Sequence, residues 1–188
     1  ETAAKILRQG IIKANAERRG YYRPIYSGVA VAMDPRNGQV LAMVSLPTYD
    51  NNRFASRIDI DYYQSLLENI YNPLINHAIT GQYAPGSTFK LVTASGALQD
   101  GVITRDRRII GEGIVHLKNK YAPNDPGQAQ PFYCWFREGH GSLNVIDALA
   151  QSCNIFFYKV GGGFEEQTVA GLGNDRLAWY SNQFGYGA

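Results

Sequence analysis

The chain of 188 residues is long enough to bury one hydrophobic core, and its 45% hydrophobic content is ordinary for a globular domain. Its 18 Lys and Arg residues nearly balance 16 acids, which excludes the strongly basic surface typical of nucleic-acid-binding proteins. The longest apolar runs, such as residues 27–33 and 154–158, are too short to cross a bilayer, and no charged-then-apolar leader opens the sequence. We therefore expect neither a signal peptide nor a membrane anchor in these residues.

The first predicted elements are a helix and a β-hairpin. Apolar residues recur three, four and seven positions apart over residues 3–14, which is the spacing of one helical face. Two apolar runs, residues 27–33 and 39–45, flank a turn in which Asn37-Gly38 supplies the positive φ angles of a tight reversal. Both runs are apolar at alternate and intervening positions, so we expect strands buried on two faces. A two-stranded hairpin is not stable alone in water, which indicates that further structure covers it and that the chain is a fragment of a larger domain.

The rest of the chain is predicted to contain loops and short helices. A loop-rich stretch with some helix leads to a helix over residues 87–99, which stops at Asp100-Gly101. Residues 105–139 are polar and are expected to be irregular, with one aromatic cluster at Phe132, Tyr133, Trp135 and Phe136. Burial beneath a loop is the more frequent arrangement for such a cluster, and the rim of a peptide groove is the alternative. Short helices are predicted over residues 143–150 and 154–160, and the chain ends in a turn-like segment.

The first motif that carries chemistry is Ser87-Thr88-Phe89-Lys90, which follows Pro85-Gly86. The Pro-Gly turn places Ser87 in the first turn of the predicted helix, where unpaired backbone N–H groups can stabilise an oxyanion. Lys90 lies three residues further on and shares a helix face with Ser87. Serine is a poor nucleophile unless a base takes its proton, and lysine becomes such a base when burial lowers its pKa. Because S-x-x-K alone is a weak pattern, the alternative is a serine at a helix start beside a solvated lysine.

A second motif, Ser152-Cys153-Asn154, lies between two predicted short helices, where side chains can converge on a cleft. The Ser152 hydroxyl can pass a proton to a leaving amine, and the Asn154 amide both donates and accepts hydrogen bonds. The alternative is that Asn154 caps the helix that follows it.

Cys134 and Cys153 are the two cysteines of the chain. Their spacing matches no metal-binding motif, and we expect no histidine near either one to complete a site. A disulfide and a pair of buried free thiols are both open interpretations. His140 lies between two glycines, and we expect a structural hydrogen bond from its ring rather than catalysis.

The ordered pair of S-x-x-K at Ser87 and S-x-N at Ser152 resembles the motifs of penicillin-recognising serine enzymes. From about Ser27 onward, the surrounding sequence is similar to class B penicillin-binding proteins of the elongation type. The resemblance implies an α+β transpeptidase fold, with helices packed on an antiparallel sheet. The stretches that carry it are residues 28–44, 83–90, 139–141, 152–158 and 183–187.

The resemblance also implies a reaction and a role for each motif residue. Ser87 would attack the penultimate D-alanine of a peptidoglycan stem peptide, and Lys90 would act as its base. Ser152 would relay the proton to the leaving amine, while Asn154 would hold Lys90 and the peptide backbone. The family forms wall cross-links, is acylated by β-lactams and requires no metal or organic cofactor.

For the parent protein, the resemblance implies a position on the extracytoplasmic face of the bacterial cytoplasmic membrane, other membrane proteins of wall synthesis as partners, and no nucleic acid. Its anchor is expected to lie outside these residues.

The sequence departs from the family pattern because K-T-G, the third motif, does not occur in it. Lys159, the last lysine, is followed by Val160-Gly161. We therefore expect residues 1–188 to be part of a transpeptidase domain, with a hairpin at 27–45, the S-x-x-K helix at 87–99 and a helical region at 104–161, and with the K-T-G part missing. The alternatives are a β-lactam sensor, an inactive fragment and a serine β-lactamase.

Overall fold

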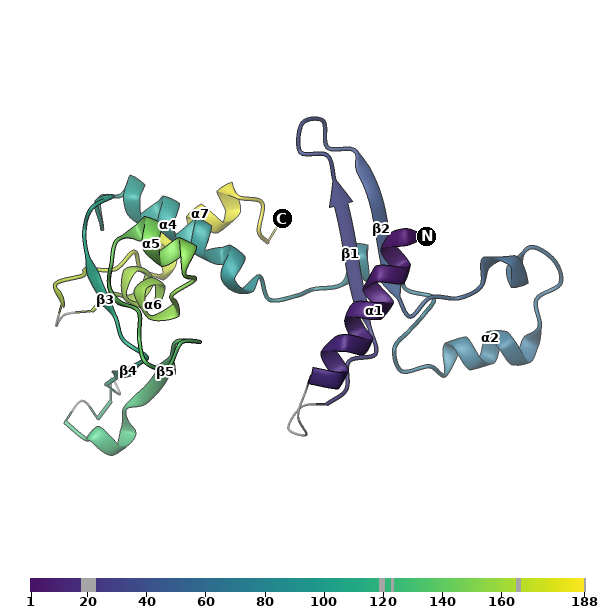
Figure 1. Cartoon of the computed structure of the whole chain (residues 1–188), viewed down its shortest axis with the longest axis horizontal. Helices are drawn as coiled ribbons and strands as arrows, with labels where there is room; N and C mark the ends of the chain where they lie inside the picture. Colours follow the sequence, from purple (N-terminus) through teal and green to yellow (C-terminus); the bar gives the residue numbers. More distant parts are fainter. Residues whose placement is uncertain (18–22, 119–120, 123, 165–166, 188) are drawn as a thin grey trace. The chain divides into compact units, whose positions relative to one another are not determined.

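The computed structural model describes residues 1–17, 23–118, 121–122, 124–164 and 167–187. The chain forms two compact units, Glu1–Tyr83 and Ala84–Ala188 (Figure 1). Among the described residues, no helix is long and apolar enough to cross a membrane.

The N-terminal unit is built on a helix and a hairpin. Its first three elements are α1 (Thr2–Glu17), β1 (Gly28–Met33) and β2 (Val40–Leu46). The strands pair antiparallel, with Ala30 opposite Val44, and Gly38 in the reversal has a φ of 75°. The predicted hairpin is therefore confirmed, and the first helix is longer at both ends than its predicted range of 3–14.

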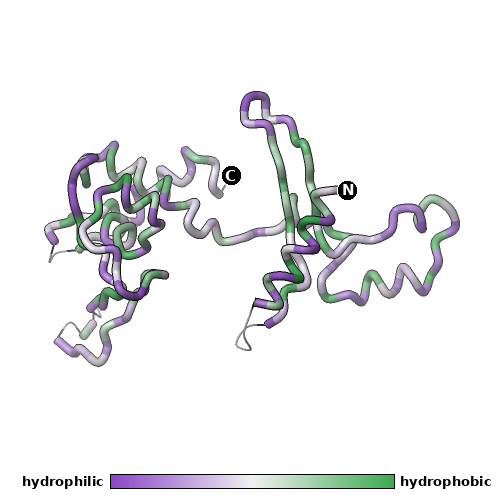
Figure 2. The backbone as a smooth tube through the Cα atoms, in the orientation of Figure 1, coloured by the Kyte–Doolittle hydropathy of each residue, from purple (hydrophilic) through white to green (hydrophobic). Residues whose placement is uncertain are grey.

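The predicted burial of both hairpin faces is wrong for the described residues. Leu46 is the single buried residue of the two strands, while Val31 is 48% and Leu41 is 69% exposed. α1 packs against both strands, and a Cβ on Gly28 would lie 3.3 Å from Ile11 Cδ1 of that helix. α3 also contacts both strands, yet apolar residues of the hairpin remain exposed. Figure 2 shows the hydrophobic colour along both strands.

Short helices complete the N-terminal unit, as the loop-rich pattern predicts. They are η1 (Asn51–Phe54), α2 (Ile60–Leu67) and α3 (His77–Thr80). Each begins after a side chain that accepts a backbone N–H, namely Asp50, Asp59 and Asn76 respectively. These caps satisfy donors that have no partner within the helix.

The C-terminal unit combines helices with short antiparallel strand pairs. Its helices are η2 (Gly86–Thr88), α4 (Phe89–Gln99), η3 (Pro126–Gln128), α5 (Val145–Ala150), α6 (Asn154–Gly162) and α7 (Asn174–Gln183). One strand pair joins β3 (Ile109–Gly111) to β6 (Gly141–Leu143), and the other joins β4 (Ile114–Leu117) to β5 (Gln130–Tyr133). Helices with antiparallel strands agree with the expected α+β class.

These strands correct the prediction that residues 105–139 are irregular. β3, β4 and β5 have three or four residues each, which is too short for a sustained alternation in the sequence. The helix predicted to start at residue 143 starts at Val145, because β6 ends at Leu143. The turn-like end of the chain is confirmed, since a turn follows α7.

The aromatic cluster is also more open than predicted. Tyr133, Trp135 and Phe136 are exposed, whereas Phe132 is partly buried and its ring packs edge-on against Tyr158. Successive side chains of a strand point to opposite faces, so Phe132 and Tyr133 of β5 have different environments. Burial beneath a loop is therefore wrong for three of the four rings.

The core of the C-terminal unit surrounds α6. Ile155, Phe156 and Val160 of this helix have no exposed surface, and Ala97 of α4 and Ala148 of α5 are equally buried. Full burial of one such large apolar side chain contributes about 1.5–3 kcal/mol. The core thus fixes α4, α5 and α6 against one another, and both sequence motifs lie in or directly beside these helices.

The far end of α4 is tied to α7 by polar contacts. Asp100 follows the last residue of α4 and accepts hydrogen bonds from the Arg176 guanidinium and, at 2.6 Å, from the Tyr180 hydroxyl. These hydrogen bonds, above all those of Arg176, lower the pKa of Asp100 to about 2. Gly96 of α4 lets Tyr180 approach, because a Cβ there would lie 2.6 Å from the ring.

Candidate active site

Ser87 and Lys90 lie where a 3₁₀ turn passes into α4. Gly86 opens η2 with a φ of 59°, Ser87 follows it, and Lys90 is the second residue of α4. The sequence placed Ser87 in the first turn of an α-helix, whereas the structure places it in the tighter turn just before. Side chains three residues apart nearly eclipse one another in a 3₁₀ turn. As a result, Lys90 Nζ lies 3.1 Å from Ser87 Oγ.

Ser152 occupies the turn that links α5 to α6. The Cys153 N–H donates to the Ala148 carbonyl and the Ser152 N–H to the Leu149 carbonyl, which is the hydrogen-bond pattern of a Schellman motif. In this motif the residue at the position of Ser152 is left-handed, and Ser152 has a φ of 50°. Glycine is favoured there, because a Cβ in this conformation costs about 1–2 kcal/mol. A serine held in this conformation is a sign of a functional role.

The Lys90 ammonium joins the two motifs. Besides Ser87 Oγ, its Nζ lies within hydrogen-bond distance of Ser152 Oγ at 2.9 Å, the Ser152 carbonyl at 2.8 Å and Asn154 Oδ1 at 2.6 Å, so three N–H groups are shared among four acceptors. The Ser152 hydroxyl also donates to Ser87 Oγ at 3.0 Å. The structure therefore brings together all four residues that the sequence singled out, although more than 60 positions separate the two motifs.

Burial sets the electrostatics of this cluster. Lys90 is only 9% exposed, and burial lowers the pKa of its ammonium because the charged form loses hydration. Negative charge on Cys134 and Cys153 acts in the opposite direction and raises it. Ser87 itself is exposed, so the cluster combines an accessible hydroxyl with a shielded amine. This is the arrangement in which a lysine can take a proton from a serine.

A cavity of about 580 Å³ opens beside Ser87. Its volume is within the range of pockets that hold small ligands. Lys90 and Asn154 provide polar groups at its wall, and Phe157 and Leu177 are among its apolar residues. Asn154 is held at this wall, because its Nδ2 donates to the Tyr133 carbonyl at 3.3 Å.

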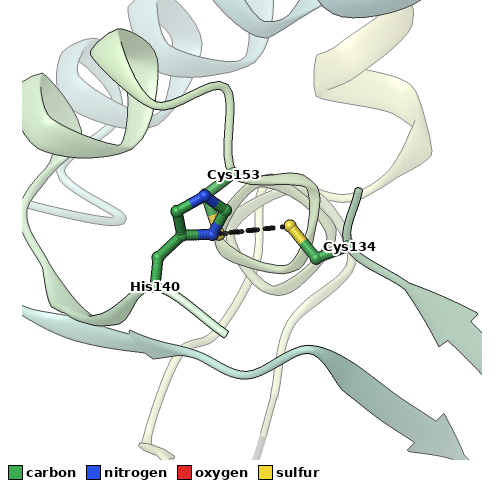
Figure 3. A group of neighbouring side chains, drawn as sticks. All are labelled: Cys134, His140 and Cys153. Carbon is green, nitrogen blue, oxygen red and sulfur yellow. Dashed lines mark hydrogen bonds between the residues drawn. The ribbon is translucent and has the colours of Figure 1, made fainter. Parts of the chain in front are cut away.

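Cys134, His140 and Cys153 form a second cluster close to the first (Figure 3). The two sulfurs are 4.0 Å apart, both thiols are free and buried, and His140 Nδ1 lies 3.6 Å from Cys134 Sγ. The two sulfurs and one ring nitrogen of His140 all lie within 4.8 Å of one another. Two thiols and an imidazole are a donor set that suits Zn²⁺, and these residues could hold such an ion.

This cluster corrects the prediction that no histidine lies near either cysteine. Bends and turns between residues 135 and 138 bring His140 back to Cys134, and Cys153 is placed beside them by the turn before α6. The expected structural hydrogen bond of His140 corresponds to the contact with Cys134, while its buried Nε2 has no partner. The sequence offered one signal for this cluster, the five residues that separate Cys134 from His140, but such a spacing is too common to indicate a metal site by itself.

The protonation of the two thiols differs. Burial raises the pKa of Cys153. Burial also opposes ionisation of Cys134, but hydrogen bonds from the backbone of Phe136, Asn154 and Ile155 outweigh it and lower the pKa. Cys134 is therefore the more acidic thiol of the pair.

Lys159 does not belong to the active-site cluster. It is 1% exposed, donates to the Ile110 carbonyl at 2.8 Å and forms an ion pair with Glu112. Its ammonium also lies 4.3 Å from the centre of the Phe164 ring. These contacts give the lysine of the Lys159-Val160-Gly161 run a place in the core rather than in the cavity.

Comparisons with known proteins agree with the two motifs. The sequence model of the penicillin-binding protein transpeptidase domain matches residues 28–188. Peptidoglycan D,D-transpeptidase MrdA of Escherichia coli K12 is 40% identical over 157 residues, which are 84% of this chain and 22% of that protein. MrdA of Acinetobacter baumannii is 36% identical over 160 residues, which are 85% of this chain and 21% of that protein. The chain thus spans about a fifth of the length of these relatives.

Solved structures give the same result. The crystal structure of Pseudomonas aeruginosa PBP2 in complex with WCK 5153 matches with a TM-score of 0.68 and 33% identity, over 96% of this chain and 34% of that one. A chain from a peptidoglycan synthase complex matches with a TM-score of 0.74 and 31% identity, over 96% of this chain and 29% of that one. Helicobacter pylori PBP2 in complex with MreC matches with a TM-score of 0.69 and 27% identity, over 98% of this chain and 30% of that one.

Proposed function

The chain belongs to the penicillin-binding protein transpeptidase family, and we propose that it is part of a peptidoglycan D,D-transpeptidase whose nucleophile is Ser87. The observation that carries the proposal is the position of Lys90, whose Nζ contacts Ser87, Ser152 and Asn154 at once. Curated relatives named peptidoglycan D,D-transpeptidase cover most of this chain and support the same reaction.

In the first step, Ser87 Oγ bonds to the carbonyl carbon of the penultimate D-alanine of a stem peptide. Neutral Lys90 takes the serine proton over the 3.1 Å contact, and its lowered pKa favours the neutral amine. The peptide bond to the terminal D-alanine then breaks. Ser152 contacts both Lys90 and Ser87, so it can pass that proton to the leaving amine, which departs as D-alanine.

In the second step, an amine from a neighbouring stem peptide attacks the Ser87 ester. A new peptide bond forms, the ester bond breaks, and the proton of the amine returns to Ser87 through the same groups. Asn154 accepts from Lys90 through Oδ1 and donates to Tyr133 through Nδ2, so it holds the lysine in both steps. A β-lactam would acylate Ser87 in the same way, with its ring amide bond broken and the amine still attached to the acyl group, and the resulting ester would be hydrolysed slowly. None of these steps uses a cofactor.

The substrate and the partners follow from the same proposal. Peptidoglycan lies outside the cytoplasmic membrane, so the longer protein would act on the extracytoplasmic face of that membrane. Its ligands would be the D-alanyl-D-alanine end of the stem peptide and β-lactams, and nucleic acid would not be one. Other wall-synthesis proteins would be its partners, as the H. pylori relative is seen with MreC.

We also propose that residues 1–188 supply only part of the catalytic domain. The sequence has no K-T-G, and Lys159 cannot replace that lysine because it is buried against Glu112. By resemblance to the family, the strand that carries K-T-G supplies a second oxyanion N–H and the group that binds the substrate carboxylate. Both would then come from outside this chain. The same absence favours the alternative of a penicillin-binding fragment without turnover.

Acylation by a fluorescent penicillin tests the proposal. We expect the longer protein that carries this chain to form a stable, labelled adduct, and the isolated 188 residues to be labelled weakly or not at all. Ser87→Ala should abolish labelling, whereas Ser95→Ala, which changes an exposed serine of α4, should retain it. Labelling of the Ser87→Ala protein would exclude Ser87 as the nucleophile, and rapid loss of the label would indicate a β-lactamase.

A further inference from the structure

The last residue of β5 and the two residues that follow it contact the turn that carries Ser152. The Tyr133 carbonyl accepts from Asn154 Nδ2 at 3.3 Å, and the sulfurs of Cys134 and Cys153 are 4.0 Å apart. Trp135 Nε1 donates to the Gln151 carbonyl at 3.0 Å. Residues 133–135 therefore run beside residues 151–154 and touch three of them. Of these contacts, the one made by Trp135 is not part of either cluster described above.

The Gln151 carbonyl has a special place in the turn. Gln151 is the C-cap of α5, where carbonyl groups have no partner within the helix. This carbonyl belongs to the peptide plane between Gln151 and Ser152, so its direction determines the φ angle of Ser152. The next carbonyl, that of Ser152, accepts from Lys90 at 2.8 Å. Both peptide planes that flank Ser152 are thus held from outside the turn.

The Trp135 ring is itself fixed in direction, although 63% of the residue is exposed. It packs edge-on against His140 at 5.4 Å between ring centres, and its plane is tilted by 47° against Phe136 at 5.8 Å. Such contacts are favourable and have a preferred geometry. The indole N–H is therefore aimed at Gln151 by neighbours on the same loop.

We propose that Trp135 is a positioning residue for Ser152. Its hydrogen bond holds the Gln151–Ser152 peptide plane and keeps Ser152 in its left-handed conformation, with Oγ directed at Lys90 and Ser87. The catalytic part of this inference rests on the function proposed above for Ser87. The structural part does not, because it concerns the conformation of the turn alone.

The test uses Trp135→Phe in the longer protein that carries this chain. Phenylalanine keeps an aromatic ring but removes the N–H donor, and the exposed position makes unfolding of the variant improbable on physical grounds. Trp179→Phe in α7 is the matched control, since it makes the same chemical change at another half-exposed tryptophan. Hydrogen exchange is measured first, on peptides that contain residues 151–154.

We expect about 3- to 10-fold faster exchange in this turn for Trp135→Phe, which corresponds to the loss of one ordinary hydrogen bond. No change is expected for Trp179→Phe. The rate constant of acylation by a fluorescent penicillin should fall by a similar factor, while the constant for the preceding non-covalent binding stays the same. In a Ser152→Ala background, Trp135→Phe should cause no further loss of acylation, because it acts through Ser152.

The results separate this proposal from the one for Ser87. Unchanged exchange in the turn would overturn the positioning role, whatever the protein does with penicillin. A fall in non-covalent binding alone, or an equal loss in the Ser152→Ala background, would also overturn it and indicate direct ligand contact. If Trp135→Phe speeds exchange in the turn but the longer protein never reacts with penicillin, the structural part is supported and the function proposed for Ser87 is rejected.

Discussion

The two units of the chain differ in how they hold their elements. Leu46 and Leu66 are buried in the N-terminal unit, whereas the other buried hydrophobic side chains of the described residues all belong to the C-terminal unit. The N-terminal hairpin follows from its turn and keeps apolar side chains open to solvent. The active-site cluster lies entirely in the C-terminal unit, on helices and a connecting turn that a core fixes in place. A hairpin can thus be specified locally, whereas this cluster cannot.

The difference has a simple cause. The Asp34 N–H donates to the carbonyl of Gln39, five positions further along the chain, and this hydrogen bond closes the hairpin turn. Lys90 and Asn154 are 64 residues apart, and only the packing of α4 against α6 brings them within 2.6 Å. Changes to the core of the C-terminal unit should therefore affect the reaction, and changes to the hairpin should affect the hairpin alone.

The largest effect is expected for Lys90→Met. It removes the proposed base, and loss of general-base catalysis lowers rates by about 10²- to 10⁴-fold. The wild-type acylation rate should rise with pH, since the neutral amine is the reactive form. Because burial lowers the pKa of Lys90, this rise should be complete below the pH at which an ordinary lysine, with a pKa of about 10.4, loses its proton.

The measurement is the rate of penicillin acylation between pH 5 and pH 10, with about two points per pH unit. This sampling resolves a midpoint that lies below the reference pKa of lysine. The Lys90→Met protein should lack the rise. Lys5→Met, an exposed lysine of the N-terminal unit, should behave as wild type. A rise that persists without Lys90 would assign the base to another group.

The second effect compares the two cores. Phe156→Ala should destabilise the C-terminal unit by about 3–5 kcal/mol, because a fully buried ring is lost and a cavity remains. Val31→Ala in the hairpin should cost less than about 0.5 kcal/mol, since Val31 is half-exposed. Trp135 and Trp179 both lie in the C-terminal unit, so urea unfolding followed by tryptophan fluorescence measures the cost of Phe156→Ala, and hydrogen exchange of the hairpin amides measures the cost of Val31→Ala. Equal costs for the two variants would contradict the comparison.

The third effect concerns the conformation of Ser152. Ser152→Ala and Ser152→Gly both remove the hydroxyl, and both should slow acylation strongly. Their stabilities should differ, because only glycine adopts a φ of 50° without strain. We expect the glycine variant to be more stable than the alanine variant by about 1 kcal/mol in the same urea experiment. Equal stability would mean that the turn relaxes when the hydroxyl is absent.

The sequence predicted the parts of this fold that depend on local chemistry. Asn37-Gly38 indicated the hairpin, and the two motifs indicated which four residues meet at the site. Burial of the hairpin was overestimated, because apolar composition does not say how many faces are covered. The Cys134, His140 and Cys153 cluster was missed, because a loop between β5 and β6 creates it. The left-handed Ser152 was also not predictable, since glycine is the residue that signals such a turn.

The smallest effect uses one substitution at two sites of the N-terminal unit. Gly38→Ala places a Cβ at a φ of 75°, which should cost about 1 kcal/mol and speed the exchange of hairpin amides about five-fold. Gly10→Ala lies in the exposed interior of α1 with nothing within 4 Å of its Cβ, so it should stabilise the helix by about 0.5–1 kcal/mol and slow the exchange of α1 amides. Neither change should alter the urea midpoint seen by tryptophan fluorescence. A shift of that midpoint by either variant would show that the two units unfold together.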